Sequence, residues 1–203
     1  GTDFMGIHCD IRSRTAVRGA IEACARRYGG LDILILNAGV FPESKAIAEL
    51  PDAAWRATME VNTDANLCML RETFELLSLS PRGGRVVVIG SKNVPAPGPG
   101  AAAYSASKAA LTQLARIAAL EWGTSGIRVN TIHPDAVFDT GIWSDEVLAS
   151  RAANYNMSVE EYKKHNILHT TITSHDVAKL VVELCGEVFA RTTGAQIPID
   201  GGN

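Results

Sequence analysis

The chain has 203 residues, and its content of 46% apolar and 20% charged residues is ordinary for a globular domain. Its formal net charge of −3 argues against nucleic acid or an anionic membrane surface as a partner. No apolar run approaches the roughly 18 residues that a membrane-spanning helix needs, so we expect no membrane partner either.

Short apolar runs recur along the chain and predict β-strands. These runs lie around Met5–Ile11, Leu31–Leu36, Arg85–Ile89, Gly126–Ile132 and Ala195–Ile199. The second run ends at the turn signal Asn37-Ala38-Gly39, and Pro134 stops the fourth.

Helical patterns fill the segments between the predicted strands. We expect helices from the N-cap Ser13 to Tyr28, over 52–79, over 102–122, as one or two helices within 142–171, and from the cap Ser174 to about Phe189. Strands that alternate with helices predict an α/β fold in which helices cover both faces of a parallel sheet. Because the chain shows neither an internal repeat nor a linker, we expect residues 1–203 to form a single domain.

The cysteines and histidines give no sign of a metal site. The chain has four cysteines: Cys9, Cys24, Cys68 and Cys185. They lack CxxC or zinc-site spacing, which favours reduced thiols in a cytoplasmic protein. His165 and His169 are four residues apart, but no carboxylate accompanies them, so we interpret them as surface histidines and expect no metal.

Tyr104 and Lys108 are the pair that most narrows the chemistry. A helix through both residues places them on one face, because they are four residues apart. An ammonium beside a phenol lowers the pKa of the phenol, so that Tyr104 could exchange a proton with a substrate hydroxyl. Ser91 follows the predicted strand 85–89 and would lie at its carboxyl end, where open α/β sheets bind ligands.

Each part of this constellation also has an ordinary explanation. A bare Tyr-x-x-x-Lys pair is most often a solvated helix face. A serine after a strand is most often a cap or a turn residue. The functional interpretation therefore depends on the surrounding motifs.

Those motifs occur together along nearly the whole chain. They are Cys9-Asp10-Ile11, Asn37-Ala38-Gly39, Val61-Asn62, Ser91, Tyr104-Ser-Ala-Ser-Lys108, Arg128-Val129-Asn130, Pro134, Thr193-Gly194 and Asp200-Gly201-Gly202. In this order they resemble the short-chain dehydrogenase/reductase family. The resemblance implies a Rossmann-like sheet and an oxidoreductase that interconverts an alcohol and a carbonyl by hydride transfer with NAD(P).

The resemblance also implies a role for each residue of the constellation. Tyr104 would be the general acid/base, and Ser91 would polarise the substrate oxygen. Lys108 would lower the pKa of Tyr104 and hold the nicotinamide ribose. Asn62 would fix the water that links Lys108 to solvent. Asn62 is also a poor residue for a helix interior, which favours a functional or kink-forming role.

Further residues match the family's cofactor contacts. Asp10 would contact the adenine, Asn37-Ala38-Gly39 would pass close to the cofactor, and Pro134 and Thr140 would lie near the carboxamide. The cofactor would be NAD or NADP, with NAD favoured. Plain turns explain Asp10 and the 37–39 segment as well.

Two departures from the family's usual pattern point to a subgroup. Asp135 stands where a glycine is usual after Pro134, and the usual Ser-Ser after the central strand is Gly90-Ser91, followed by Lys92 and Asn93. With the run Pro-Asp-Ala-Val-Phe, these features resemble the dehydrogenase half of bifunctional rhamnulose-1-phosphate aldolase/alcohol dehydrogenases. That resemblance implies rhamnose catabolism, lactaldehyde as the small-molecule substrate and an N-terminal aldolase domain in the parent chain.

The family's first strand, glycine-rich turn, helix and second strand are not in the 203 residues. We therefore expect a sheet truncated at its N-terminus, in which the first two strands are missing and nothing cradles the cofactor pyrophosphate. The Met5–Ile11 strand would then pair directly with Leu31–Leu36, or another chain would cover that edge. The family's usual assembly implies a homo-oligomer, a tetramer or a dimer, through helices 52–79 and 102–122.

Three hypotheses about function remain open at this point. The first is an NAD(P)-dependent dehydrogenase. The second is a catalytically incompetent fragment or non-catalytic module of such an enzyme. The third is a related lyase or epimerase that uses the same Tyr104 and Lys108 pair.

Overall fold

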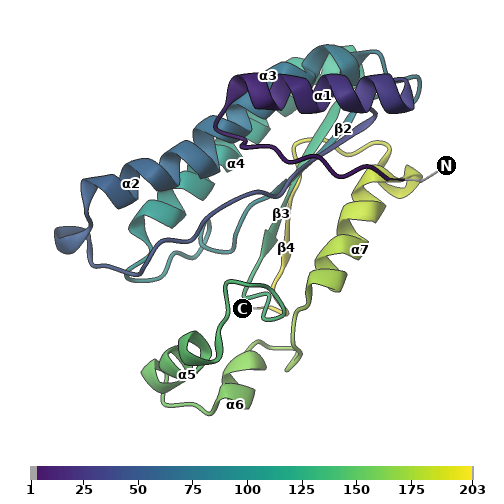
Figure 1. The fold of residues 1–203 in the computed structure, drawn as a ribbon. Coiled ribbons are helices and arrows are strands. Elements are labelled where there is room, and N and C mark those ends of the chain that lie inside the picture. The colour runs from purple at the N-terminus through teal and green to yellow at the C-terminus, as the bar shows by residue number, and fades with distance from the viewer. Residues whose placement is uncertain (1–3, 203) are drawn as a thin grey trace.

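The computed structural model describes residues 4–202, and within them four strands form one sheet (Figure 1). The strands are β1 (Ile33–Leu36), β2 (Arg85–Ile89), β3 (Arg128–Pro134) and β4 (Gln196–Ile199). Their order in the sheet is β1-β2-β3-β4, and every pairing is parallel. The predicted Rossmann-like parallel sheet is confirmed.

Seven α-helices connect these strands within the described residues. They are α1 (Arg14–Tyr28), α2 (Asp52–Met59), α3 (Ala65–Ser78), α4 (Ala102–Trp122), α5 (Asp145–Asn154), α6 (Val159–Lys163) and α7 (Ser174–Cys185). The predicted helix over 102–122 and the predicted strand over 85–89 match α4 and β2 residue for residue. Ser13 caps α1 as expected, since its hydroxyl accepts a hydrogen bond from the Ala16 amide.

Successive side chains of the central strand β2 point to opposite faces of the sheet, so the strand contributes to the core on both faces. Val86 and Val88 pack with side chains of α3 and α4 on one face. Val87 packs on the other face with Leu184 of α7. All four of these residues are almost completely buried. Helices therefore cover both faces of the sheet, as predicted.

The predicted helix over 52–79 is continuous but not uniform. α2 and α3 are joined by a wide π-helical turn, η2, over Glu60–Asp64, and Asn62 lies in this turn with no solvent exposure. Such turns disturb the regular hydrogen-bond ladder and are frequent at functional sites. Asn62 thus lies where the regular helix is interrupted, and the choice between a functional and a kink-forming role stays a prediction.

The predicted Met5–Ile11 strand is wrong, and so is its pairing with the Leu31–Leu36 run. Residues 4–10 form no strand, and β1 pairs only with β2 among the described residues. The segment crosses the strands before it enters α1 (Figure 1), and Cys9 and Ile11 line an apolar hollow of about 220 Å³ beside Leu34. Only Cys9 and Ile11 are half-buried, whereas Phe4, Met5 and Ile7 are exposed, and no neighbouring strand offers the segment a ladder.

The start of α7 differs by one residue from the prediction. Thr173, not Ser174, is the N-cap, and its capping box is completed by the Asp176 carboxylate. The Ser174 hydroxyl donates instead to Asp139 at 2.7 Å. The helix ends at Cys185, short of Phe189, because Gly186 is extended and a separate 3-10 turn follows over Glu187–Phe189.

The segment after β3 forms α5 and α6, within the bounds of the predicted one or two helices. Both helices lie beyond the carboxyl ends of β3 and β4 (Figure 1). Ser144 and Ser158 cap them. Within residues 4–202, no helix combines the length and the apolar composition that crossing a bilayer would take.

Candidate active site

Ser91, Tyr104 and Lys108 come together at the carboxyl end of β2. Ser91 follows β2, and the other two residues lie in the first turns of α4. A hydrogen bond joins the side chains of Ser91 and Tyr104, and Lys108 Nζ lies 5.9 Å from the centre of the Tyr104 ring. Ser91 and Lys108 are buried, and Tyr104 is half-buried. The structure therefore assembles the group that the sequence predicts.

Local backbone contacts hold each member in place. The Lys92 amide donates to the Pro134 carbonyl at 2.9 Å, which extends the contact between β2 and β3 beyond Ser91. The Asn93 amide donates to Ser91 Oγ at 3.1 Å. At the start of α4, Ala101 pairs with Lys45 in an isolated bridge. The loop between Ser91 and Tyr104 is thus fixed at both ends.

The ionisation of Tyr104 differs from the prediction. Burial raises the pKa of Tyr104, and the hydrogen bond from Ser91 only partly opposes this effect. Burial also lowers the pKa of Lys108 from 10.5 to about 8. The Lys108 ammonium donates to the Ile89 carbonyl at 2.8 Å. The expected net lowering of the Tyr104 pKa is therefore not seen, because desolvation of the phenol is the larger effect.

Asn62 connects the wide turn of the long helix to the segment after β1. Its Oδ1 accepts from the Val40 amide at 2.8 Å, and its Nδ2 donates to the Val40 carbonyl at 2.9 Å. Nδ2 also donates to Ser107 Oγ at 3.0 Å, one residue before Lys108. Asn62 thus bridges the chain after β1 to the helix that carries Tyr104. Its predicted role in holding a water stays a prediction.

The segment Asn37-Ala38-Gly39 leaves the carboxyl end of β1 and approaches Lys108. A Cβ on Gly39 would lie 3.2 Å from Asn62 Oδ1 and 3.5 Å from Lys108 Nζ. A glycine is therefore suited to this position, because a Cβ would crowd the Asn62 side-chain oxygen. The segment thus lies close to Lys108, and its contact with a cofactor stays a prediction.

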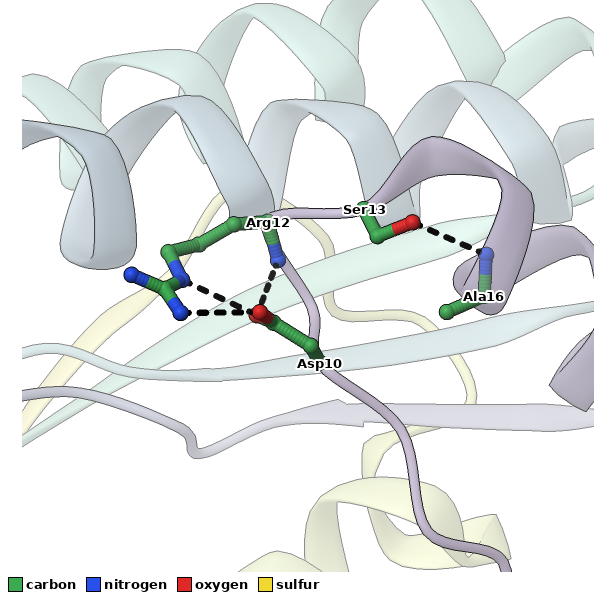
Figure 2. Close-up of polar contacts among 4 residues, drawn as sticks. All are labelled: Asp10, Arg12, Ser13 and Ala16. Carbon is green, nitrogen blue, oxygen red and sulfur yellow. Dashed lines mark hydrogen bonds and ion pairs between the residues drawn. The ribbon is translucent and has the colours of Figure 1, made fainter.

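Asp10 and Thr140 have local partners away from Tyr104. The Asp10 carboxylate accepts from the amide and the guanidinium of Arg12 (Figure 2). The Ser13 amide donates to the Asp10 carbonyl. Arg12 holds the pKa of Asp10 at about 2. Thr140 Oγ1 donates to the Val137 carbonyl at 2.8 Å. Asp10 is thus the turn residue of the alternative interpretation, and the adenine and carboxamide contacts stay predictions.

Two residues of the site region have contacts that the sequence did not predict. The Phe41 ring packs on Tyr104 with centroids 4.6 Å apart. The buried His133 imidazole has Nδ1 3.2 Å from the Ser91 amide nitrogen and 2.9 Å from the Ser91 carbonyl oxygen. One feature of the sequence could have indicated the His133 contact. Gly90 stands where the family usually has a serine, and a glycine leaves space for a bulky residue opposite it.

This fold and this site define a class of protein: an α/β oxidoreductase whose Ser, Tyr and Lys meet at the carboxyl ends of a parallel sheet. Comparison with known proteins agrees, since a family model described as Enoyl-(Acyl carrier protein) reductase matches residues 1–203. The chain belongs to the short-chain dehydrogenase/reductase family.

Relatives within the family are similar over nearly the whole chain. The uncharacterized oxidoreductase YuxG of Bacillus subtilis is 36% identical over 98% of the chain, and an uncharacterized NAD-dependent oxidoreductase of Mycobacterium tuberculosis is 32% identical over 100% of it. The crystal structure of a dehydrogenase/reductase from Sinorhizobium meliloti matches 98% of the chain with a TM-score of 0.83 and 33% identity, and the match covers 73% of that protein. The chain spans 29% of the length of the Bacillus protein and 73% of the Mycobacterium protein.

Proposed function

We propose that the protein containing this chain interconverts an alcohol and a carbonyl with NAD(P), and that Tyr104 is its general acid/base. The observation that carries the proposal is the Ser91–Tyr104 hydrogen bond with the buried Lys108 beside it. When bound, the nicotinamide supplies or accepts the hydride. The protein must then orient the substrate oxygen and move one proton.

The residues present fit the ribose end of such a cofactor. An ammonium has three donors, and the Ile89 carbonyl accepts from one of those of Lys108, so that the group has the capacity to bond ribose hydroxyls as well. Gly39 keeps the space beside Lys108 clear of a side chain. Residues that cradle a pyrophosphate are not identified in this chain, and we propose that a glycine-rich segment of the whole protein supplies them.

The proton chemistry follows from the positions of the three side chains. Ser91 and Tyr104 would both bond the substrate oxygen, so that the proton passes between the phenol and that oxygen. With a pKa of about 8, Lys108 is mostly charged at neutral pH. We propose that its positive charge favours the phenolate during proton transfer. The Ser91 hydrogen bond also offsets part of the burial effect on the pKa of Tyr104.

A finer assignment rests on the subgroup resemblance. We propose lactaldehyde as the substrate, a place in rhamnose catabolism and an aldolase domain in the same chain. The Ser91-Lys92-Asn93 and 134–138 runs support this assignment. The match to only 29% of YuxG agrees with a dehydrogenase part in a longer protein. NAD is favoured over NADP because the Mycobacterium relative is named NAD-dependent.

Assembly and location are also proposals. Large apolar side chains are exposed on α4, where Leu120 is 79% and Ile117 is 42% exposed, and they support a homo-oligomer that buries this helix. The four free cysteines are consistent with the cytoplasm. One domain over residues 1–203 is likewise proposed.

The test is turnover by the full natural chain with Tyr104→Phe as the variant and Tyr28→Phe, on the exposed face of α1, as its matched control. We expect Tyr104→Phe to lower kcat by about 10²–10⁴-fold while nicotinamide binding is retained. Tyr28→Phe should be as active as the wild type. Full activity of Tyr104→Phe would contradict the assigned role.

The same measurements separate the other hypotheses. Substrate conversion without any change in the absorbance of reduced nicotinamide would favour a lyase or epimerase. Failure of the 203-residue chain to bind NAD or NADP, beside an active full chain, would make this chain alone a non-catalytic module.

A further inference from the structure

Lys92 and Asp135 form an ion pair beside Ser91. Lys92 directly follows Ser91, and Asp135 directly follows Pro134 at the end of β3. Lys92 Nζ lies 3.7 Å from Asp135 Oδ2. The Lys92 amide bonds the Pro134 carbonyl and the Asp135 amide bonds the Ile199 carbonyl, so the sheet contacts hold both backbones. The pair therefore spans the carboxyl ends of β2 and β3, at the edge where Ser91 lies.

Both members of this pair are half-buried. The Lys92 side chain is 19% exposed and that of Asp135 is 21% exposed. By contrast, Glu160 in the Lys163–Glu160 pair on α6 is 74% exposed. Removing two charges from water is costly, and only close geometry with hydrogen bonds repays the cost. At 3.7 Å the two groups are beyond hydrogen-bonding distance of each other, so the ion pair itself uses none of their hydrogen-bonding capacity.

The pair also faces the helices that extend over this edge of the sheet. Tyr162 of α6 is buried in an aromatic cluster with Phe138 and Trp143. Burial raises the pKa of Tyr162, and the Asp135 carboxylate adds to this effect, which places the carboxylate in electrostatic reach of the phenol. Asp135 thus acts on the aromatic cluster from the edge of the sheet at which Ser91 lies.

A hydroxyl group matches the chemistry of this pair. A hydroxyl accepts a hydrogen bond from an ammonium and donates one to a carboxylate at the same time. We propose that Lys92 and Asp135 bind a second hydroxyl of the substrate, next to the carbon whose oxygen contacts Ser91 and Tyr104. The substrate class is then a small vicinal diol or the corresponding hydroxycarbonyl. This inference rests on the proposed function, because it needs the reacting oxygen at Ser91.

The test compares diols with their monohydroxy analogues in the full natural chain. The probes are 1,2-propanediol against 1-propanol and 2-propanol, with the corresponding hexane compounds as a second set. We expect kcat/KM of the wild type to favour the diols by about 100-fold or more, because a site built to bond a hydroxyl rejects the analogue that lacks it.

The variants are Lys92→Met, Asp135→Leu and the double variant. A single substitution leaves one buried charge without its partner and can unfold the protein, whereas removing both charges is often tolerated. The double variant should lose at least about tenfold of the diol preference, mostly through KM, and retain its kcat with monohydroxy alcohols. The double variant Lys163→Met/Glu160→Leu, at a more exposed ion pair on α6, should keep the preference.

The outcomes separate the inference from the proposed function. Turnover without a diol preference, or a preference that persists in the double variant, overturns the inference and leaves the proposed function in place. An equal loss for diols and monohydroxy alcohols shows a purely structural ion pair and also overturns it. If the wild type converts none of the probes with NAD or NADP, the inference fails, and the proposed function is then judged by its own test.

Discussion

The imidazole of His133 lies so close to Gly90 that a Cβ at position 90 would be 2.7 Å from His133 Nδ1. The same Cβ would be 3.0 Å from Thr131 Cγ2, so neighbouring side chains enclose position 90 on two sides. The same imidazole bonds the backbone of Ser91. Gly90 and His133 therefore depend on each other, because the small residue leaves the space that the large residue fills. They lie next to Ser91 of the candidate proton-transfer site.

We expect Gly90→Ala to destabilise the chain by about 1–3 kcal/mol, because it overpacks this contact. His133→Ala should relieve the clash, so the double variant should be more stable than the sum of the single effects predicts. Urea unfolding of the four proteins measures the coupling. Gly19→Ala in α1, where a Cβ meets nothing within 4 Å, is the control and should stabilise by about 0.5–1 kcal/mol. Additive effects at 90 and 133 would contradict the coupling.

The stability of the protein should rise with pH through the titration of Lys108. Its pKa in the folded chain is about 8, against an ordinary value of 10.5, so the unfolded chain binds more protons between these values. Below pH 8, burial of the charged ammonium lowers the free energy of unfolding by about 3 kcal/mol. This loss disappears as the pH rises to 10.5. Lys108→Met lacks this titration, so the difference in unfolding free energy between the two proteins should change across that window.

The exposed Lys179→Met is the control for this measurement. It should give a pH profile parallel to that of the wild type, since Lys179 is exposed on α7. Parallel profiles for the wild type and Lys108→Met would show that Lys108 is not desolvated.

Asn62→Ala should destabilise the chain by about 3 kcal/mol. The substitution leaves the amide and the carbonyl of Val40 without their partner and also removes the contact with Ser107. Chemical unfolding measures the loss. Gln113→Ala on the exposed side of α4 should stay within about 0.5 kcal/mol of the wild type. A loss below about 1 kcal/mol for Asn62→Ala would mean that water replaces these bonds.

The Asp10 carboxyl should titrate at a pKa of about 2 when followed by NMR, below its ordinary value of 3.8. Arg12→Met should move this pKa back towards 3.8, because the hydrogen bonds from Arg12 are its main cause. The stabilisation from the pair is complete above pH 3.8 and is lost as pH falls through 2. Arg14→Met, whose guanidinium bonds Glu72, should leave the Asp10 pKa unchanged.

Elements with strong local signals could be predicted from the sequence. β2 is a continuous apolar run between glycines, and α4 follows a loop rich in proline and glycine, so their bounds follow from neighbouring residues alone. The start of α7 could not be predicted in the same way. Thr173 and Ser174 are both good caps, and the choice depends on Asp139, which engages Ser174 from 35 residues away.

The candidate site could likewise be predicted only in part from the sequence. The spacing of Tyr104 and Lys108 predicts their shared helix face, and the structure confirms it. The direction of the Tyr104 pKa depends on burial, and no local pattern reports burial by distant elements such as Phe41. The segment 5–11 has the composition of a strand, but a strand also needs a neighbour, which composition cannot supply.

The wide turn over Glu60–Asp64 limits how the length of this chain can vary. Each residue of a helix advances the side chains by about 100°, so inserting one more residue beside this turn would rotate α3 by that angle relative to α2. Leu70 and Leu77 would then leave the sheet, and Asn62 would leave Val40. Insertions and deletions should therefore be excluded from residues 52–78, whereas substitutions on their exposed side remain acceptable.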